Sequence, residues 1–202
     1  MFGYGSLVGV RADRRVATRP ACARPEIYRP PTRQPHATGF VAEVVGFRRT
    51  WGVAMDNRRD LPGYKYYTAA DGGRPAVFVA FLDIRPSDDR QATVNGLCVP
   101  VDDAALEALD GRERNYERID VSARISTAAA VGFRVWTYIG SALGRDRLRQ
   151  GRAAGAAVID ANYVNAVSAG FRSLGEAEHR ACAASLDPGD LPVVPLRRHD
   201  LT

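Results

Sequence analysis

Glu113 is the acidic residue whose place in the sequence best suits proton transfer. It lies between Asp110 and Tyr116, where a short predicted helix ends and a strand is about to begin. A carboxylate that is half-buried at such a junction can have its pKa raised by desolvation, which favours proton exchange near neutral pH. The alternative interpretation is structural, with Glu113 paired to a neighbouring arginine: Arg112, Arg114 or Arg118.

Other reaction chemistries lack their residue patterns here. Ser6 does not stand in a G-x-S-x-G turn, and His36 alone precedes the predicted late helices, which argues against a Ser-His-Asp hydrolase. The N-terminal glycines lack the spacing of a phosphate loop or a dinucleotide-binding turn. The cysteines form no CxxC pair and give no zinc spacing with the histidines, so we predict reduced thiols in a cytoplasmic protein and no metal.

The first seven residues form the second candidate site. They read as a short strand ending in a glycine turn, in which Phe2 and Tyr4 suit a buried position and Gly5 lets the backbone bend. Ser6 then presents a hydroxyl group and an amide N–H. If Met1 is the true start, this strand must insert directly into a sheet.

Strand patterns cover residues 39–47, 48–55, 77–84, 92–99, 119–125 and 133–139. A short helix is expected over 104–110, capped by Asp102 or Asp103, and an amphipathic helix over 160–173. Gly175 should close the latter, and another helix should run from Glu176 toward 185. Residues 56–75 read as a long loop whose three tyrosines either line a pocket or form a lid over the core: Tyr64, Tyr66 and Tyr67.

The order of these elements predicts one domain over residues 1–202. Residues 11–38 read as an irregular Arg- and Pro-rich loop at the rim of a site, with a short helix near 13–18. No strand is expected after about residue 140; residues 155–186 should be helical and 187–202 an extended tail. Many strands first and helices late indicate an α+β fold with a closed or strongly curved sheet, covered on one face by two helices.

The charge of the chain invites a nucleic-acid interpretation that its distribution does not favour. The formal net charge is +5, but 27 of the 28 basic residues are arginines scattered along the sequence, and Lys65 is the only lysine. We therefore expect a solvated surface and no nucleic-acid partner. No run of 18 apolar residues is present, so we predict no membrane span, and no cleavable signal pattern is found.

Two motifs in order resemble the γ-glutamylcyclotransferase superfamily, which includes the ChaC-type and AIG2-like branches. These are Tyr4-Gly5-Ser6-Leu7 and, about a hundred residues later, Leu109-Asp110-x-x-Glu113-x-x-Tyr116-x-Arg118. The resemblance covers roughly residues 2–173. It implies a small mixed β-barrel flanked by helices, with a cavity at one end. Many ChaC-type members carry a tryptophan soon after the first motif, where this chain has Val8-Gly9.

The resemblance also implies roles for residues. Glu113 matches the catalytic glutamate of the family, and the backbone amides of Tyr4, Gly5, Ser6 and Leu7 would bind the glutamyl head group. Tyr116 and Tyr138 match tyrosines near the pocket. The implied reaction, part of glutathione metabolism in the family, closes a γ-glutamyl group into 5-oxoproline and releases an amine or amino acid, without a metal or organic cofactor.

Three alternatives remain open at this point. The enzyme could be specialised for γ-glutamyl amines or for a biosynthetic intermediate. The same cavity could instead sense a small acid without turnover, and a Glu113 locked to an arginine would favour that interpretation. A nucleic-acid-binding module is the third alternative.

Overall fold

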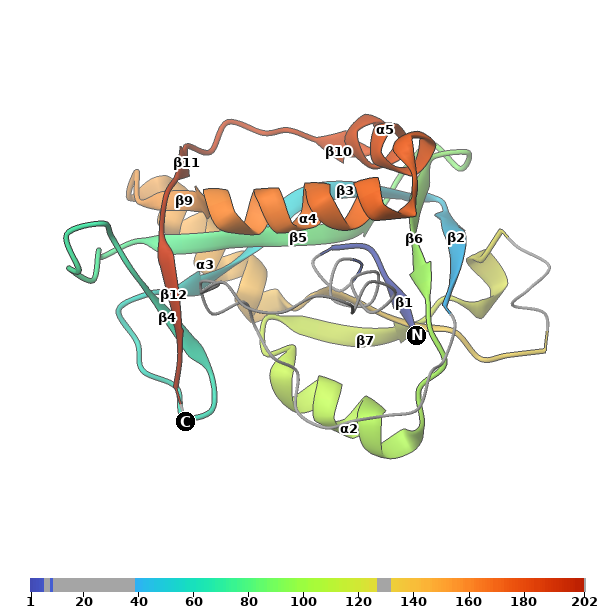
Figure 1. Ribbon diagram of the computed structural model, residues 1–202, viewed down its shortest axis with the longest axis horizontal. Coiled ribbons are helices and arrows are strands. Elements are labelled where there is room, and N and C mark those ends of the chain that lie inside the picture. Colours follow the sequence, from blue (N-terminus) through green and yellow to red (C-terminus); the bar gives the residue numbers. More distant parts are fainter. Residues whose placement is uncertain (6–7, 9–38, 127–131, 202) are drawn as a thin grey trace, which may run out of the picture.

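The computed structural model describes residues 1–5, 8, 39–126 and 132–201. Ser6, Leu7, the predicted loop 11–38 and the predicted helix near 13–18 lie outside the described residues. The expected α+β architecture is confirmed: curved sheets hold the core, and helices lie against their outer faces (Figure 1).

Two sheets form the frame. In the first, β6 (Thr93–Cys98) lies between β1 (Phe2–Gly3) and β2 (Phe40–Val45) and is antiparallel to both. The second has the order β10 (Leu186–Asp187), β3 (Phe47–Asp56), β5 (Phe78–Pro86), β9 (Ala157–Asp160) and β11 (Val193–Val194). β2 leads into β3 through Gly46, whose φ of 78° bends the chain from one sheet into the next. The sheets together curl into a half-barrel.

The N-terminal strand is inserted into the first sheet as predicted. Phe2 pairs with Cys98 and Gly3 with Leu97, while Met1 N donates to the Val99 carbonyl at 2.6 Å. The approach is close enough to require a glycine in β6, because a Cβ on Gly96 would lie 2.3 Å from the Gly3 carbonyl oxygen. The positions of Tyr4 and Gly5, which follow β1, therefore depend on a residue some ninety positions away.

The helices pack apolar side chains against the core. α2 (Asp103–Arg112) begins at Asp102, whose carboxylate accepts a hydrogen bond from Ala105 N at 2.7 Å, and it buries Leu106 and Leu109. α4 (Ala161–Leu174) follows the expected stripe and buries Val167 and Phe171. Gly175 separates α4 from α5 (Glu176–Ala184), as predicted. Figure 1 shows α4 along the five-stranded sheet and α2 at the opposite side of the molecule.

A buried arginine ties α4 and α5 to both sheets. Arg49 on β3 is fully buried; its Nη2 donates to the Asn95 carbonyl at 2.6 Å and its Nη1 to the Cys182 carbonyl at 3.0 Å. The guanidinium also stacks over the Phe171 ring at 5.0 Å. Burial lowers the pKa of Arg49 from its ordinary value. Hydrogen bonds from the guanidinium to carbonyl groups replace its lost hydration, which explains how an arginine is tolerated in this core.

Several predicted boundaries are wrong. The expected loop 56–75 contains β4 (Lys65–Thr68), which pairs antiparallel with β12 (Arg197–Asp200) in the predicted tail. Strands also occur after residue 140, namely β9 to β12, and α3 (Ala142–Ala153) was not predicted. The strand expected at 119–125 is β7 (Tyr116–Asp120), which pairs with β8 (Trp136–Gly140) and is followed by a 3-10 turn at Ser122–Arg124. Short strands paired at long range leave little local pattern.

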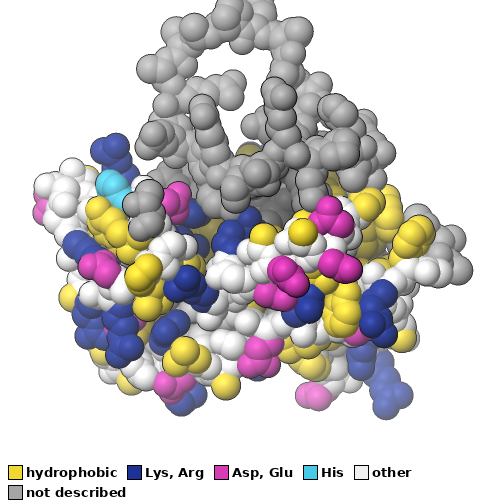
Figure 2. All heavy atoms as spheres, turned by 90° about the horizontal axis from the view of Figure 1, so that it is seen from below, with side chains coloured by type: hydrophobic (Ala, Val, Ile, Leu, Met, Phe, Trp, Pro, Cys, Tyr) yellow, Lys and Arg dark blue, Asp and Glu magenta, His cyan; other side chains and the backbone are white. Residues whose placement is uncertain are grey.

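The surface and the helices bear on two further expectations. On the face shown in Figure 2, basic and acidic side chains are interspersed over the described residues. Among the residues that the structure describes, no helix is long and apolar enough to cross a membrane. The prediction of a single domain stays a prediction. The late strands β10, β11 and β12 pair with β3, β9 and β4, which all come earlier in the chain.

Candidate active site

Tyr4 fixes the end of β1 against β8. Its side chain is buried, and its hydroxyl donates to the Tyr138 carbonyl oxygen at 2.6 Å. Burial raises the pKa of Tyr4 well above its ordinary value, and the negative charge of Asp83 acts in the same direction. The hydroxyl therefore stays protonated near neutral pH and acts as a structural donor.

Gly5 opens the turn that follows. Its carbonyl oxygen accepts a hydrogen bond from Val8 N at 3.0 Å. A Cβ placed on Gly5 would lie 3.2 Å from the hydroxyl oxygen of Tyr163, which comes from α4. Gly5 thus lies directly beside the hydroxyl group of Tyr163 on the late helix. Ser6 and Leu7, which were predicted to complete the turn, lie outside the described residues.

Glu113 lies at the predicted junction, between α2 and β7. Its N–H donates to the Leu109 carbonyl and its own carbonyl accepts from Tyr116 N, both at 2.8 Å. These two bonds fix its backbone while the chain passes from helix to strand. The side chain is 21% exposed, so the carboxylate is half-buried, as expected from its position.

The Glu113 carboxylate is held at one oxygen. Arg112 Nε and Nη2 lie 3.2 and 3.1 Å from Oε1, whereas none of the described residues donates a hydrogen bond to Oε2. The other two arginines are engaged elsewhere: Arg114 donates to the Pro62 carbonyl, and Arg118 pairs with Asp110. The ion pair predicted by the structural interpretation is therefore present, and it leaves one carboxylate oxygen able to accept a proton.

The negative charge of Glu113 contributes to the raised pKa values of four tyrosines. In each, burial is the main cause of a raised pKa, and the nearby Glu113 carboxylate raises the pKa further: Tyr4, Tyr64, Tyr116 and Tyr138. The pKa of Tyr64 is raised to about 12. These four phenols therefore stay protonated near neutral pH and add no second negative charge near the Glu113 carboxylate.

Tyr116 and Tyr138 form the framework around this group. The Tyr116 hydroxyl donates to the Leu82 carbonyl on β5 at 2.7 Å. The Tyr138 hydroxyl donates to Asp110 Oδ1 at 2.7 Å, and Arg118 lies 3.4 Å from the other oxygen of Asp110. Both tyrosines thus connect α2 and β7 to the strands behind them. The structure brings Tyr4, Glu113, Tyr116 and Tyr138 together, with Gly5 joined to them through Tyr163.

Asp83 is a buried acidic residue that sequence reasoning missed. Its side chain is fully buried, Gly140 N donates to Oδ1 at 2.6 Å, and Arg145 Nε lies 3.5 Å from Oδ2. A Cβ on Gly52 would lie 2.5 Å from Asp83, so a glycine is required beside it. Its place as the only acidic residue in the apolar run 77–84 was the available signal. These contacts give Asp83 a structural role, because they connect β5 to β8 and to α3.

Lys65 is the second residue that was missed. On β4, its Nζ lies 4.3 Å from the centre of the Phe81 ring and 5.2 Å from that of Tyr64. The Tyr64 hydroxyl accepts a hydrogen bond from Asn115 Nδ2 at 3.0 Å, two residues after Glu113. The signal in the sequence was that Lys65 is the only lysine among 27 arginines.

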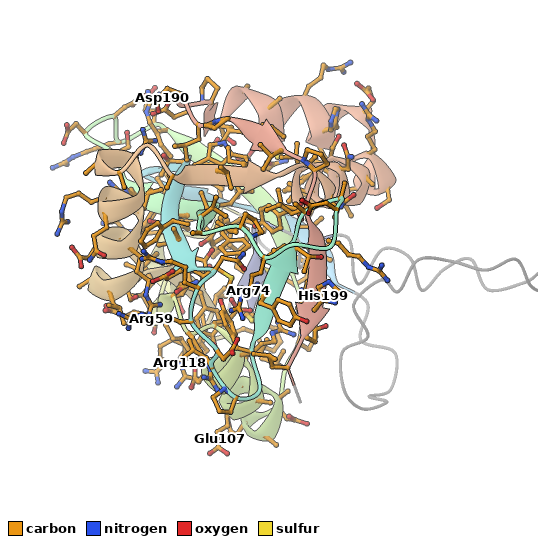
Figure 3. All side chains as sticks on the ribbon, turned by 90° about the vertical axis from the view of Figure 1, so that its left-hand side faces the viewer. Arg59, Arg74, Glu107, Arg118, Asp190 and His199 are labelled. Atoms are coloured by element: carbon orange, nitrogen blue, oxygen red, sulfur yellow. The ribbon has the colours of Figure 1, made fainter. Side chains whose placement is uncertain are left out.

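The three tyrosines of the predicted loop have three different environments. Tyr67 packs in the core, and Tyr64 borders the group around Glu113. Tyr66 stacks on His199 with ring centres 4.8 Å apart and has Arg74 at 4.7 Å, on the side of the molecule shown in Figure 3. Neither predicted role, lining a pocket or forming a lid over the core, therefore applies to all three tyrosines.

Comparison with known proteins identifies the family. The sequence model described as gamma-glutamyl cyclotransferase, AIG2-like, matches residues 1–154. The chain belongs to this family, as the two motifs predicted. A search of curated proteins gives no match.

A solved structure supports the fold. A protein named gamma-glutamyl cyclotransferase superposes with a TM-score of 0.51 at 14% identity, over 94% of this chain and 88% of that one. A human protein described as uncharacterized gives a TM-score of 0.47 at 15% identity over the same shares. At these identities the first likeness concerns the fold alone, and it extends over the C-terminal residues that lie beyond the family match.

Proposed function

We propose that this protein cyclises a γ-glutamyl group to 5-oxoproline and releases an amine or amino acid, with Glu113 as the general acid and base. The observation that carries the proposal is the placement of Glu113. Its half-buried carboxylate has one oxygen held by Arg112 and lies within the electrostatic reach of Tyr4, at the start of the predicted head-group turn. Membership of the cyclotransferase family supports the same reaction.

The chemistry is intramolecular. The α-amine attacks the γ-carbonyl carbon of the same glutamyl group, the ring C–N bond forms, and the original amide C–N bond breaks. Because nucleophile and electrophile share one molecule, the protein mainly has to hold the folded-back conformer, and effective molarities for such reactions reach about 10⁵–10⁸ M. No covalent bond to the protein is required.

Proton transfer is the part that needs a side chain. An α-amino group has a pKa of about 7.7–8.0, so much of it is protonated near neutral pH and cannot attack. Oε2 of Glu113 takes a proton from the amine and later delivers one to the departing nitrogen. Arg112 holds Oε1 and so fixes the direction in which Oε2 points.

The neutral tyrosines and the turn provide the rest of the site. The raised pKa values of Tyr4 and Tyr116 keep both hydroxyl groups protonated, so they add no second negative charge beside Glu113. Backbone amides of the Tyr4–Leu7 turn would bind the glutamyl head group, at its α-carboxylate or at the oxyanion that forms on the γ-carbonyl. Loss of one oxyanion donor typically costs about 10²–10³ in rate.

The proposal is tested by release of 5-oxoproline from a panel of glutathione, γ-glutamyl amino acids and γ-glutamyl amines. We expect Glu113→Gln to fold normally and to lose turnover on every compound that the wild type processes, because an amide keeps the shape but cannot take the proton. Glu107→Gln is the matched control, since Glu107 is an exposed residue on the same helix and projects from its outer side in Figure 3. Substantial turnover by purified Glu113→Gln would refute the assignment.

The Arg112–Glu113 ion pair also favours a second candidate function, the binding of a small acid without turnover. In that case no compound of the panel releases 5-oxoproline, yet γ-glutamyl compounds bind with measurable heat in calorimetry. Turnover by the wild type that disappears in Glu113→Gln excludes this second function.

A further inference from the structure

Lys65 occupies a core-facing position in β4. In the antiparallel pair, Lys65 is opposite Asp200 and Tyr67 is opposite Arg198, whereas Tyr66 and Thr68 belong to the other face with His199 and Arg197. Side chains alternate along a strand, so Lys65 shares its face with Tyr67, which is 2% exposed. The Lys65 side chain is partly exposed, and its ammonium group lies beside the aromatic rings on this face.

The Lys65 ammonium contacts aromatic rings instead of an anion. Its Nζ packs over Phe81 at 4.3 Å and Tyr64 at 5.2 Å, and it forms no hydrogen bond or ion pair with any described residue. Cation–π contacts replace only part of the hydration that burial removes. The ammonium group is therefore available to pair with an anionic group of a ligand.

Two chains of contact connect Lys65 with the two sides of the candidate active site. On one side, Phe81 packs edge-on against Tyr163 at 5.3 Å, and the Tyr163 hydroxyl lies over Gly5. On the other side, Tyr64 is held by Asn115, two residues from Glu113. Lys65 is thus near the site, but Phe81 and Tyr163 separate it from the turn that would hold the glutamyl head group.

We propose that Lys65 binds a carboxylate on the leaving half of the substrate, so that the enzyme prefers γ-glutamyl amino acids or peptides to γ-glutamyl amines. The inference rests on the cyclotransferase function proposed above. If the head group occupies the turn and its γ-carbonyl lies beside Glu113, the part of the substrate that extends past the γ-carbonyl is the part that can reach beyond Tyr163. A carboxylate there would pair with the Lys65 ammonium group, which has no anionic partner among the described residues.

Charges around the ammonium agree with this role. The pKa of Lys65 is lowered to about 7, mainly by burial; Arg198 and Arg112 also lower it, whereas Glu113 and Asp200 act in the opposite direction. These groups come from β12 and from the end of α2. An anion that binds at Nζ favours the charged form, so binding of the carboxylate should be stronger below about pH 7 than above it.

The test compares γ-glutamylglycine with γ-glutamylethylamine, which differ by a carboxylate in place of a methyl group on the leaving half. We expect Lys65→Met to raise KM for γ-glutamylglycine by about tenfold or more, as for the loss of a charged hydrogen bond, with a much smaller change for γ-glutamylethylamine. Lys65→Arg should restore part of the preference. In the wild type, the KM for γ-glutamylethylamine divided by the KM for γ-glutamylglycine should exceed one at pH 6 and fall toward one as pH rises to 9. In Lys65→Met this ratio should not change with pH.

Arg197→Met is the matched control, because it also removes one positive charge but lies on the opposite face of the β4–β12 pair. It should leave the preference unchanged. An equal effect of Lys65→Met on the two compounds, or the same shift in Arg197→Met, overturns the inference. Calorimetry of both compounds with Glu113→Gln and with Glu113→Gln/Lys65→Met separates binding from turnover. A Lys65-dependent preference in binding, without 5-oxoproline release by the wild type, would refute the proposed function and keep the carboxylate site.

Discussion

Gly96→Ala tests whether the site depends on the close approach of β1 to β6. The added Cβ would lie 2.3 Å from the Gly3 carbonyl oxygen and 2.7 Å from the Phe2 ring. Even weak C–H···O contacts place carbon and oxygen about 3.3–3.6 Å apart, so the strands must separate by roughly 1 Å. Neither neighbour is the end of a flexible chain: one is backbone and the other is a ring that is 1% exposed.

The cost of this separation follows from what holds β1 in place. Overpacking a core by a methyl group costs about 1–3 kcal/mol, and each backbone hydrogen bond lost between Met1–Gly3 and β6 adds about 0.5–1.5 kcal/mol. We expect a loss of about 2–4 kcal/mol in unfolding free energy. For a chain of this size that corresponds to roughly 4–16 °C in Tm.

Two measurements check the prediction: thermal or urea unfolding, and 5-oxoproline release well below the new Tm. Because β1 leads directly into Tyr4 and Gly5, turnover should fall even where the variant is fully folded. Gly111→Ala in α2 is the control, since no atom lies within 4 Å of its added Cβ. There alanine should stabilise the helix by up to about 1 kcal/mol. A Gly96→Ala protein with wild-type stability and turnover would refute the reasoning.

Two further predictions concern the tyrosines and the lysine. Tyr4→Phe removes the donor to the Tyr138 carbonyl and should lower the unfolding free energy by about 1–2 kcal/mol in a urea titration. Tyr66→Phe is the control and should be near neutral, because the Tyr66 hydroxyl makes no hydrogen bond to the described residues. The folded-state pKa of Lys65 is about 7, below its ordinary 10.5, so between these pH values the unfolded chain holds a proton that the folded chain releases. Wild-type stability should therefore gain on that of Lys65→Met as pH rises from 7 to 10, and a constant difference would contradict the lowered pKa.

The position of Glu113 between a helix and a strand could be predicted because its signals are local. Asp102 caps a helix whose inward side is marked by Leu106 and Leu109, and the end of that helix fixes where Glu113 must stand. The stripe that ends in Val167 and Phe171 placed α4 in the same way. A periodic apolar pattern is a property of neighbouring residues, so it survives without knowledge of the fold.

The residues around Lys65 could not be predicted, because their positions depend on pairing at long range. β4 has four residues, two of them tyrosines and one a lysine, and its partner β12 begins 129 residues after β4 ends. Four residues of mixed polarity look like a loop until the partner strand defines which face is buried. β9 was missed for a related reason, since a run as short as Ala157–Asp160 cannot be distinguished from part of a helix.

The pairing of β4 with β12 divides the chemistry proposed for this protein from its proposed selectivity. Glu113 and the Tyr4–Leu7 turn lie within residues 1–154, which match the family, whereas the strand that holds Lys65 in register is Arg197–Asp200. Changes in Arg197–Asp200 should thus alter which leaving groups are accepted without changing the residues proposed to close the ring. Exchanging this terminal strand between homologues offers a direct route to altered substrate choice.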